Sequence, residues 1–237
     1  MSNSWFQFKQ FTIQQDKCAM KVSTDACIQA AWTPLMESVN TVLDIGTGTG
    51  LLSLMLAQRL PAAHIDALES ESQAAEQAAQ NSLLSPFNSR IAVHHCDATQ
   101  WTSDHRYDLI ICNPPFFTDS LRGRDHARNQ ARHSGSLNLQ SLLDLLHHHL
   151  SPKGYASIML PPSDHQRFSA LAQQGQIFLR KKLEVQDSEK GRITRVIGIY
   201  CSEAIEFPGI ERLIIKNDDA AYSAEFTALL QPFYLYL

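Results

Sequence analysis

The chain has 237 residues, of which 44% are hydrophobic and 19% charged, and its formal net charge is −4 at pH 7. A chain of this length and composition can bury one substantial core, so we expect a single domain overall. The N-terminus carries no apolar signal segment and no apolar run approaches about eighteen residues, so we expect neither export nor a membrane span. Five scattered cysteines without a C-x-x-C pair indicate reduced thiols and a cytoplasmic location.

Taken in chain order, the predicted elements alternate between strands and helices. Residues 1–40 read as an N-terminal extension whose amphipathic helix, from about residue 25 to residue 37, packs over the ligand site of the domain formed by residues 41–237. Strands are predicted at 41–45, 63–68, 90–95, 107–112 and 154–160, and helices at about 50–60, 71–84 and 138–150. This alternation is typical of an α/β fold with a doubly wound parallel sheet covered on both faces. Two further strands, 177–186 and 193–201, flank a turn at 187–191 and predict a C-terminal antiparallel hairpin.

Three consecutive histidines, 147–149, lie on the last predicted helix. Successive helical positions point about 100° apart, so the three rings cannot converge on one metal ion. We therefore expect a solvated face there and no metal site.

A glycine-rich turn follows the first predicted strand of the sheet. Asp44 precedes Gly46, Gly48 and Gly50 in the order D-I-G-T-G-T-G, and a helix begins directly afterwards. Glycines let the backbone approach a ligand closely, and the helix N-terminus offers free N–H groups. The dinucleotide fingerprint G-x-G-x-x-G would need glycine where Leu51 stands. Asp44 would repel a nicotinamide pyrophosphate, whereas it suits a ligand that carries an amino acid and a sulfonium.

Two more acids end the next two strands. Glu69 follows Gly50 by nineteen residues, which is a distance suited to ribose hydroxyls, and Asp97 precedes Ala98 at the end of the third strand. Each acid alone has an alternative reading as a helix N-cap. Three acids at three successive strand ends favour a ligand site.

The strand at 107–112 runs directly into Asn113, Pro114, Pro115 and Phe116. In open α/β sheets, ligands bind at the carboxyl ends of the strands. The prolines stiffen the turn, so the Asn113 amide and the Pro114 carbonyl can be fixed as two hydrogen-bond acceptors, and Phe116 supplies a flat face. This arrangement suits an exocyclic amine on a flat ring, or an amide. The alternative is a strand that simply ends at prolines.

Together these motifs resemble the class I methyltransferases that use S-adenosylmethionine and methylate planar exocyclic nitrogens. The sequence more closely resembles the bacterial tRNA1(Val) (adenine37-N6)-methyltransferase family. That likeness rests on residues 8–11, 15–25, 31–33 and 56–59 and on the aromatic tail at 222–235. Ser23 is a departure, because the family usually has glycine there; serine is small, and we expect it to be tolerated.

The resemblance implies a Rossmann-like class I sheet whose last strand is antiparallel, S-adenosylmethionine as the cofactor and tRNA as the partner. It implies that Asn113, Pro114, Pro115 and Phe116 are catalytic. It also implies donor contacts from Asp44, Gly46, Thr47, Gly48, Gly50, Glu69, Asp97, Ala98, Val22 and Thr24. The amine lone pair of adenine is delocalised into the ring, so the expected gain is mainly positioning, without a metal and without an assigned base. A stacked base on Phe116 is worth roughly 1–3 kcal/mol.

Basic residues concentrate in two stretches despite the negative net charge. Residues 117–136 hold four arginines against two aspartates, and residues 180–195 hold six cations against three acids. Local patches of this kind are what phosphate neutralisation needs. The RNA-contact candidates are Arg122, Arg124, Arg128, Arg132, Lys181, Lys182, Arg192 and Arg195. The alternative for each stretch is solvated surface charge.

Three other functions stay open on the sequence alone. An RNA guanine-N2 methyltransferase, for instance one acting on rRNA, uses the same N-P-P-F motif but often carries a duplicated domain. A protein glutamine N5-methyltransferase typically has tyrosine in place of Phe116 and a longer helical N-terminal domain. A non-catalytic RNA-binding module would have no need of both the donor acids and the acceptor turn. The oligomeric state is not predicted, and a monomer is compatible with the sequence.

Overall fold

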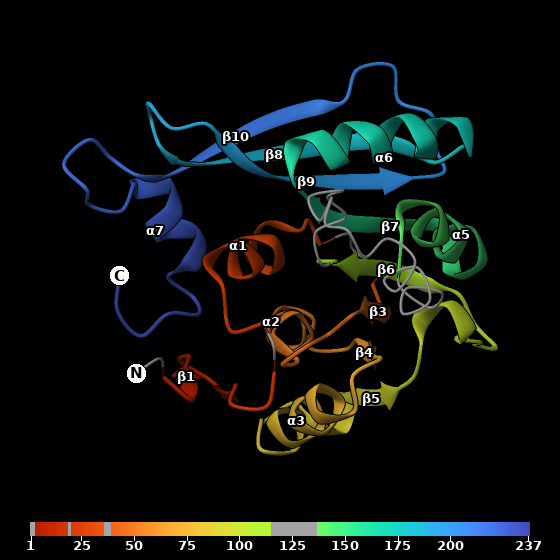
Figure 1. The fold of residues 1–237 in the computed structure, drawn as a ribbon, viewed down its shortest axis with the longest axis horizontal. Coiled ribbons are helices and arrows are strands. Elements are labelled where there is room, and N and C mark those ends of the chain that lie inside the picture. The colour runs from red at the N-terminus through yellow and green to blue at the C-terminus, as the bar shows by residue number, and fades with distance from the viewer. Residues whose placement is uncertain (1–2, 19, 36–38, 115–136) are drawn as a thin grey trace, which may run out of the picture.

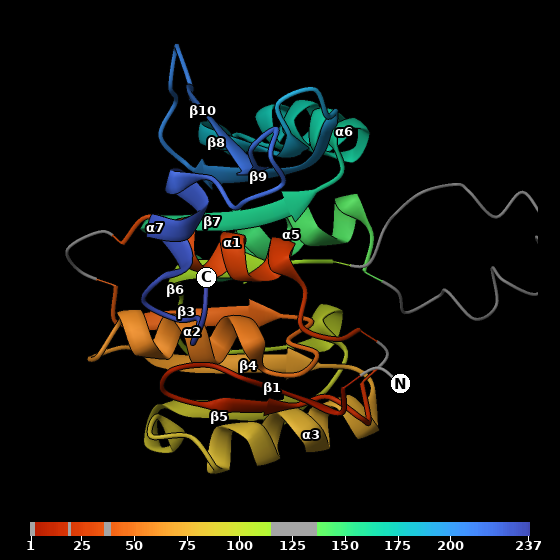
Figure 2. The ribbon, with the colours of Figure 1, turned by 90° about the vertical axis from the view of Figure 1, so that its left-hand side faces the viewer.

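The computed structural model describes residues 3–18, 20–35, 39–114 and 137–237. An eight-stranded sheet in the order β10-β8-β9-β7-β6-β3-β4-β5 forms the centre of the molecule (Figures 1 and 2). Its strands are β3 (Thr41–Ile45), β4 (His64–Glu69), β5 (Ile91–His95), β6 (Tyr107–Cys112), β7 (Leu150–Leu160), β8 (Phe178–Ser188), β9 (Ile193–Cys201) and β10 (Gly209–Lys216). Strand β9 pairs antiparallel with both β7 and β8, while the other neighbours pair in parallel. The predicted α/β sheet with a C-terminal antiparallel hairpin is confirmed.

Helices cover both faces of this sheet (Figure 1). They are α1 (Thr24–Trp32), α2 (Leu51–Arg59), α3 (Ser72–Leu83), α5 (Leu139–His149), α6 (Pro162–Gln174) and α7 (Ala224–Leu230). The central strands alternate between the faces: Leu109 and Ile111 join the apolar core under α1 and α2, and Ile110 joins the core under α5 and α6. Because both faces are buried, β6 reads as an almost continuous apolar run in the sequence.

Helix α1 is shorter than predicted, ending at Trp32 instead of near residue 37. Its C-cap Thr33 has φ −47° and ψ 121°, and this ψ is not helical. Pro34 follows, and the proline ring disfavours helical backbone in the residue before it. The predicted helix was too long because the hydrophobic pattern of the sequence continues beyond Pro34.

Hydrogen bonds from β2 and from Lys9 join the N-terminal segment to the rest of the domain. Strands β1 (Trp5–Gln7) and β2 (Thr12–Gln14) form an antiparallel hairpin. Gln14 exchanges two backbone hydrogen bonds with the Asn81 side chain on α3, at 2.8 and 2.9 Å. The same Asn81 amide donates to the Thr49 carbonyl at 2.8 Å, so one buried side chain ties the hairpin to the glycine turn. The chain ends also meet, since the Lys9 N–H donates to the Phe233 carbonyl at 2.8 Å.

The histidine run on α5 only partly follows the prediction of a solvated face. His147 and His148 are exposed, but His149 is buried and turns toward Tyr107, with ring centroids 6.3 Å apart. Burial lowers the pKa of His149, which favours its neutral form. The prediction was wrong for His149. Each helical residue points about 100° away from the one before it, and at His149 this rotation brings the side chain to the face of α5 that packs on the core.

All five cysteines are free thiols. Within the described residues, no helix has both the length and the apolar character needed to cross a bilayer.

Candidate active site

The glycine turn links β3 to α2 through residues with positive φ. Gly46 and Gly48 have φ values of 72° and 57°, which side chains other than glycine rarely adopt. A Cβ built at either position would meet no atom of the described residues within 4 Å. The open space beside this backbone is therefore available to a ligand. The amides of Gly46 and Thr47 both donate to the Leu68 carbonyl at 2.9 Å, which holds the turn against the end of β4.

Asp44 lies beneath that turn and is completely buried. Its Oδ2 accepts hydrogen bonds from Thr47 Oγ1 at 2.6 Å and from Ser53 Oγ at 2.7 Å. Its Oδ1 is buried and has no hydrogen-bond partner among the described residues. Burial raises the pKa of Asp44 to about 6, although the two hydroxyl donors oppose that rise. A buried carboxylate with one unsatisfied oxygen suits the positive charge of a ligand held just above it.

The other two predicted acids lie on the same edge of the sheet. Glu69, at the end of β4, accepts from the Gly48 amide through Oε2 at 2.8 Å and from the Glu71 amide through Oε1 at 3.0 Å. Asp97 follows β5 and caps the short helix at Ala98–Gln100, accepting from the Thr99 amide at 2.9 Å. Ala98 packs partly buried against the core under α5. Three neighbouring strands thus deliver the three acids and Ala98 to one edge.

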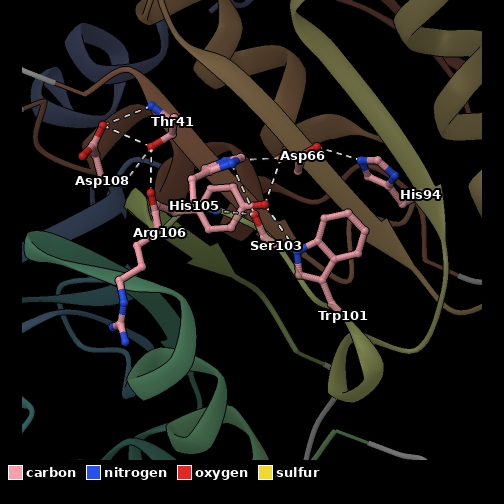
Figure 3. Close-up of polar contacts among 9 residues, drawn as sticks. Thr41, Asp66, His94, Trp101, Ser103, His105, Arg106 and Asp108 are labelled. Carbon is pink, nitrogen blue, oxygen red and sulfur yellow. Dashed lines mark hydrogen bonds and ion pairs between the residues drawn. The ribbon is translucent and has the colours of Figure 1, made fainter.

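A polar network supports the segment that follows Asp97 (Figure 3). Asp66 on β4 lies 2.7 Å from His94 Nε2 and accepts from the Tyr107 hydroxyl at 2.9 Å. Trp101 donates its indole N–H to the same hydroxyl at 3.3 Å, and its ring lies 4.5 Å from that of His94. No local sequence motif predicts this network, because its members come from three separate strands and a loop.

Asn113 and Pro114 directly follow β6, which pairs with β3 through Ile45 and Cys112. The acceptor turn and the glycine turn therefore leave adjacent strands at the same edge. Asn113 and Pro114 line a hollow of about 220 Å³. The remaining lining residues are Met20, Lys21, Ser23, Asp25, Met159 and Arg195. Pro115, Phe116 and the arginines Arg122, Arg124, Arg128 and Arg132 lie outside the described residues.

The N-terminal segment reaches this hollow through α1. Ser23 caps the helix, accepting from the Ala26 amide at 3.2 Å, and half-buried Val22 and exposed Thr24 flank it. Serine fits the position because the hydroxyl serves as a helix cap. The buried Gln29 donates from Nε2 to the carbonyls of Cys112 and Ser157, both at 3.0 Å. Gln29 thus joins α1 to the end of β6, immediately before Asn113, and to the neighbouring strand β7, a role that sequence reasoning missed.

The basic residues of the C-terminal hairpin differ in their surroundings. Lys181 Nζ lies 2.6 Å from Glu211 Oε1 and 5.1 Å from the centre of the Trp32 ring. Lys182 Nζ lies 2.6 Å from Glu184 Oε1. Arg192 is exposed, whereas Arg195 lines the hollow beside Asn113. The structure brings only Arg195 of these four to the acceptor turn.

Comparison with known proteins adds the family to this geometry. The family model described as a methyltransferase small domain matches residues 24–137. A tRNA1(Val) (adenine(37)-N6)-methyltransferase of Cytophaga hutchinsonii is 41% identical over 239 residues and covers all of both chains. The protein of the same name in Vibrio campbellii is 39% identical and covers 97% of this chain and 95% of its own.

Solved structures agree on the fold. A predicted O-methyltransferase of Agrobacterium tumefaciens superposes with a TM-score of 0.66 at 18% identity, covering 88% of this chain and 96% of its own. The ribosomal protein L11 methylase of Lactobacillus delbrueckii gives 0.56, also at 18% identity, covering 81% and 84%. These two structures share the fold at low sequence identity, whereas the two curated relatives match the chain over nearly its full length at 39–41% identity. The chain belongs to the tRNA1(Val) (adenine(37)-N6)-methyltransferase family.

Proposed function

We propose that this protein transfers the methyl group of S-adenosylmethionine to the exocyclic N6 of adenine 37 in tRNA1(Val). One observation carries the proposal in the structure: the glycine turn and the Asn113–Pro114 acceptor turn leave the adjacent strands β3 and β6 at one edge of the sheet. A methyl donor and a flat amine placed at those two turns would be neighbours. The full-length likeness to the curated relatives supports the choice of tRNA as substrate.

The residues present fit the donor. The open space beside Gly46 and Gly48 accommodates a ligand against bare backbone, and the unpartnered Oδ1 of Asp44 favours a positive charge above it. We assign donor binding to these residues with Thr47, Gly50, Glu69, Asp97, Ala98, Val22 and Thr24. When bound, S-adenosylmethionine supplies an activated methyl group on a sulfonium leaving group. In this proposal residues 1–40 form an extension that packs on the donor site, and residues 41–237 form the catalytic domain.

The chain's own residues orient the acceptor amine. The Asn113 amide oxygen and the Pro114 carbonyl accept the two N6 hydrogens, which turns the lone pair of the amine toward the methyl group. Pro115 stiffens this turn, and Phe116 stacks on the base. The gain is one of positioning, because the leaving group is already activated. The proton is lost after the methyl group has been transferred, and no side chain is assigned to accept it.

A base in an anticodon loop is already unpaired and can be extruded at low cost. The site therefore does not require an element that opens a duplex. We place this reaction in the bacterial cytoplasm, with tRNA as the partner and without a metal.

A transfer assay with labelled S-adenosylmethionine tests the proposal. Separate pools of tRNA, rRNA and protein are incubated with the enzyme, and the products are identified by nucleoside and peptide mass spectrometry. We expect label in N6-methyladenosine from the tRNA pool, and loss of that label with Asn113→Ala. Label in N2-methylguanosine from rRNA would support the guanine alternative, and label in a protein glutamine would support the amide alternative. Either result would overturn the proposal.

A further inference from the structure

The loop between β5 and β6 carries two of the proposed donor contacts, Asp97 and Ala98. It leaves β5 beside the end of β4, where the Cys96 amide donates to the Glu69 carbonyl at 2.9 Å. A single tight turn follows, in which the Trp101 amide donates to the Ala98 carbonyl at 3.1 Å. Because this turn is short and hydrogen-bonded, the position of Trp101 determines where the two donor contacts lie.

The Trp101 side chain is held by the hydroxyl of Tyr107, the first residue of β6. That hydroxyl accepts from the indole N–H at 3.3 Å and donates to Asp66 Oδ2 on β4 at 2.9 Å. Ser103, from the same loop, forms a further hydrogen bond with it. An indole N–H only donates and a carboxylate only accepts, so the direction of both measured bonds is fixed. Burial raises the pKa of Tyr107 to about 12, so at neutral pH the hydroxyl keeps the proton that it donates to Asp66.

Asp66 is in turn held by two histidines. Its Oδ1 lies 2.7 Å from His94 Nε2 on β5, and its Oδ2 lies 3.9 Å from His105 Nε2. The centre of the His94 ring also lies 4.5 Å from the centre of the Trp101 ring, and Figure 3 shows Asp66, His94 and Trp101 grouped beside the loop. Trp101 is therefore fixed twice, through its N–H by Tyr107 and through its ring by His94.

Tyr107 also belongs to the strand that leads to the acceptor turn. Strand β6 begins at Tyr107, and Asn113 directly follows its last residue. The hydroxyl of Tyr107 thus joins the loop of the donor contacts to the strand of the acceptor turn. Tyr107 is fully buried, so it can influence a bound donor only through the residues that it holds.

We propose that Tyr107 is a positioning residue for methyl-donor binding. Its hydroxyl, held by Asp66, fixes Trp101 and so keeps Asp97 and Ala98 in the arrangement that receives the donor. Without the hydroxyl the loop would populate other arrangements, and the apparent affinity for the donor would fall in proportion to the remaining population of the binding arrangement. This inference rests on the proposed function, because it takes Asp97 and Ala98 as donor contacts.

Two matched hydroxyl deletions test this role. Tyr107→Phe removes the hydroxyl and keeps the ring. Tyr200→Phe is the control, because Tyr200 is fully buried in the same apolar core under α5 and α6. Its hydroxyl lies 2.9 Å from Ser169 Oγ and 3.0 Å from His165 Nδ1, and neither partner is a proposed donor contact. Calorimetry gives the Kd for S-adenosylmethionine, thermal unfolding gives the Tm, and tRNA methylation gives kcat at saturating donor.

We expect both substitutions to lower the Tm, because each deletes a buried, hydrogen-bonded hydroxyl. Only Tyr107→Phe should raise the Kd for S-adenosylmethionine, by roughly 5- to 20-fold, as for a loop that is in the binding arrangement about 5–20% of the time. Its kcat at saturating donor should stay within about twofold of the wild type, because the bound donor restores the loop. A purely structural role would lower the Tm without separating the two variants in Kd. An unchanged Kd for Tyr107→Phe, or an equal rise for both variants, would overturn the inference.

A double-mutant cycle with Asp97→Asn shows whether Tyr107 acts through the donor contacts. Asparagine also caps helices well, so this substitution removes the charge of Asp97 and keeps its cap on the short helix. Tyr107→Phe should weaken donor binding by a smaller factor in the Asp97→Asn background than in the wild type. Equal factors in the two backgrounds would contradict an action through this turn.

Trp101→Phe removes the N–H on the other side of the same hydrogen bond and should raise the Kd in the same direction, so it decides the question if Tyr107→Phe does not fold. If the affinity for S-adenosylmethionine does not respond to Asp97→Asn, Asp97 is not a donor contact, and the error lies in the proposed function. If the affinity responds to Asp97→Asn but to neither Tyr107→Phe nor Trp101→Phe, this inference alone is overturned.

Discussion

Asp44 combines two properties that are rare together in a carboxylate. It is fully buried, and one of its oxygens has no hydrogen-bond partner among the described residues. Burial raises its pKa from 3.8 to about 6, which means that the charged form is disfavoured in the protein without ligand. A cation held above Oδ1 would favour the charged form and bring this pKa down again. Binding of a cationic donor is therefore coupled to release of a proton from Asp44.

The sign of that coupling gives a first prediction. Below a pH of about 6 the Asp44 carboxyl is largely protonated, so binding of the cationic ligand must release that proton. Above this pH the carboxyl is already ionised, and binding releases no proton. The affinity for S-adenosylmethionine should therefore rise with pH up to about 6 and then level off. Calorimetry at several pH values across this range measures the affinity. Asp44→Asn is the control, and its affinity should be lower and should not change with pH. A wild-type affinity that does not change with pH would contradict this role for Asp44.

Substitution of Asn113 should affect the rate of methyl transfer without affecting the binding of S-adenosylmethionine. In the proposal its amide oxygen contacts the acceptor amine and not the donor. Asn113→Ala should therefore reduce kcat by at least about 100-fold while the affinity for S-adenosylmethionine stays within about twofold of the wild type. Single-turnover kinetics and calorimetry supply the two numbers. Wild-type turnover by this variant would remove the acceptor pair from the mechanism.

At the scale of elements, prediction succeeded where local pattern decides the outcome. Strands β3 and β6 have the predicted bounds, because their apolar runs stop directly before Gly46 and Asn113. Strand β10 and helix α7 went unpredicted. Half-exposed β10 pairs through its backbone with β8, and that partner is known only once the sheet has formed. The mixed polar and apolar sequence of β10 carries no strict period to reveal it.

The same distinction applies to the candidate site. Asp44, the glycines, Glu69, Asp97 and Asn113 were recognisable because each lies beside the end of a strand in the sequence. Gln29, Ser53 and the pair of Asp25 with Arg195 were not, since their partners are distant along the chain or, for Ser53, lie across the glycine turn. Sequence reasoning grouped Arg195 with Lys181 and Lys182, whereas in the structure these lysines face Glu211 and Glu184.

Gln29 is the buried side chain that joins helix α1 to strands β6 and β7. Gln29→Met keeps the length of the side chain but leaves the carbonyls of Cys112 and Ser157 without this donor. Loss of a donor to a buried acceptor costs about 1–3 kcal/mol, so the free energy of unfolding should fall by about that amount. Urea unfolding measures it. The exposed Gln173→Met on α6 is the matched control and should change stability by less than about 0.5 kcal/mol. Equal effects of the two substitutions would show that the Gln29 bonds carry no stability.

At the scale of the whole molecule, charge is unevenly distributed. The net charge is −4, yet four arginines fall within residues 117–136, directly after the acceptor turn. On the C-terminal hairpin, ion pairs with nearby glutamates reduce what Lys181 and Lys182 can offer to an RNA phosphate. The stretch beside the acceptor turn should therefore contribute more to RNA binding than the hairpin does.

Salt dependence measures these contributions. Log affinity for tRNA should fall linearly with log salt, with a slope of about 0.7–0.9 for each phosphate contact. Replacing Arg122, Arg124, Arg128 and Arg132 by alanine should flatten this slope by more than replacing Lys181 and Lys182 does, and donor affinity should stay unchanged. Lys153→Ala, an exposed change near the start of β7, is the control. If the four-arginine variant kept the wild-type slope, the RNA surface would lie elsewhere.

The central claim concerns one atom of one nucleotide, and locating the methyl group tests it most directly. Unmodified tRNA1(Val) and the same tRNA with guanine at position 37 are each incubated with the enzyme and S-adenosylmethionine, then digested and sequenced by mass spectrometry. The account predicts one methyl group on N6 of adenine 37 in the first tRNA and none in the second. A methyl group at another position of the first tRNA, or on the guanine of the second, would contradict it.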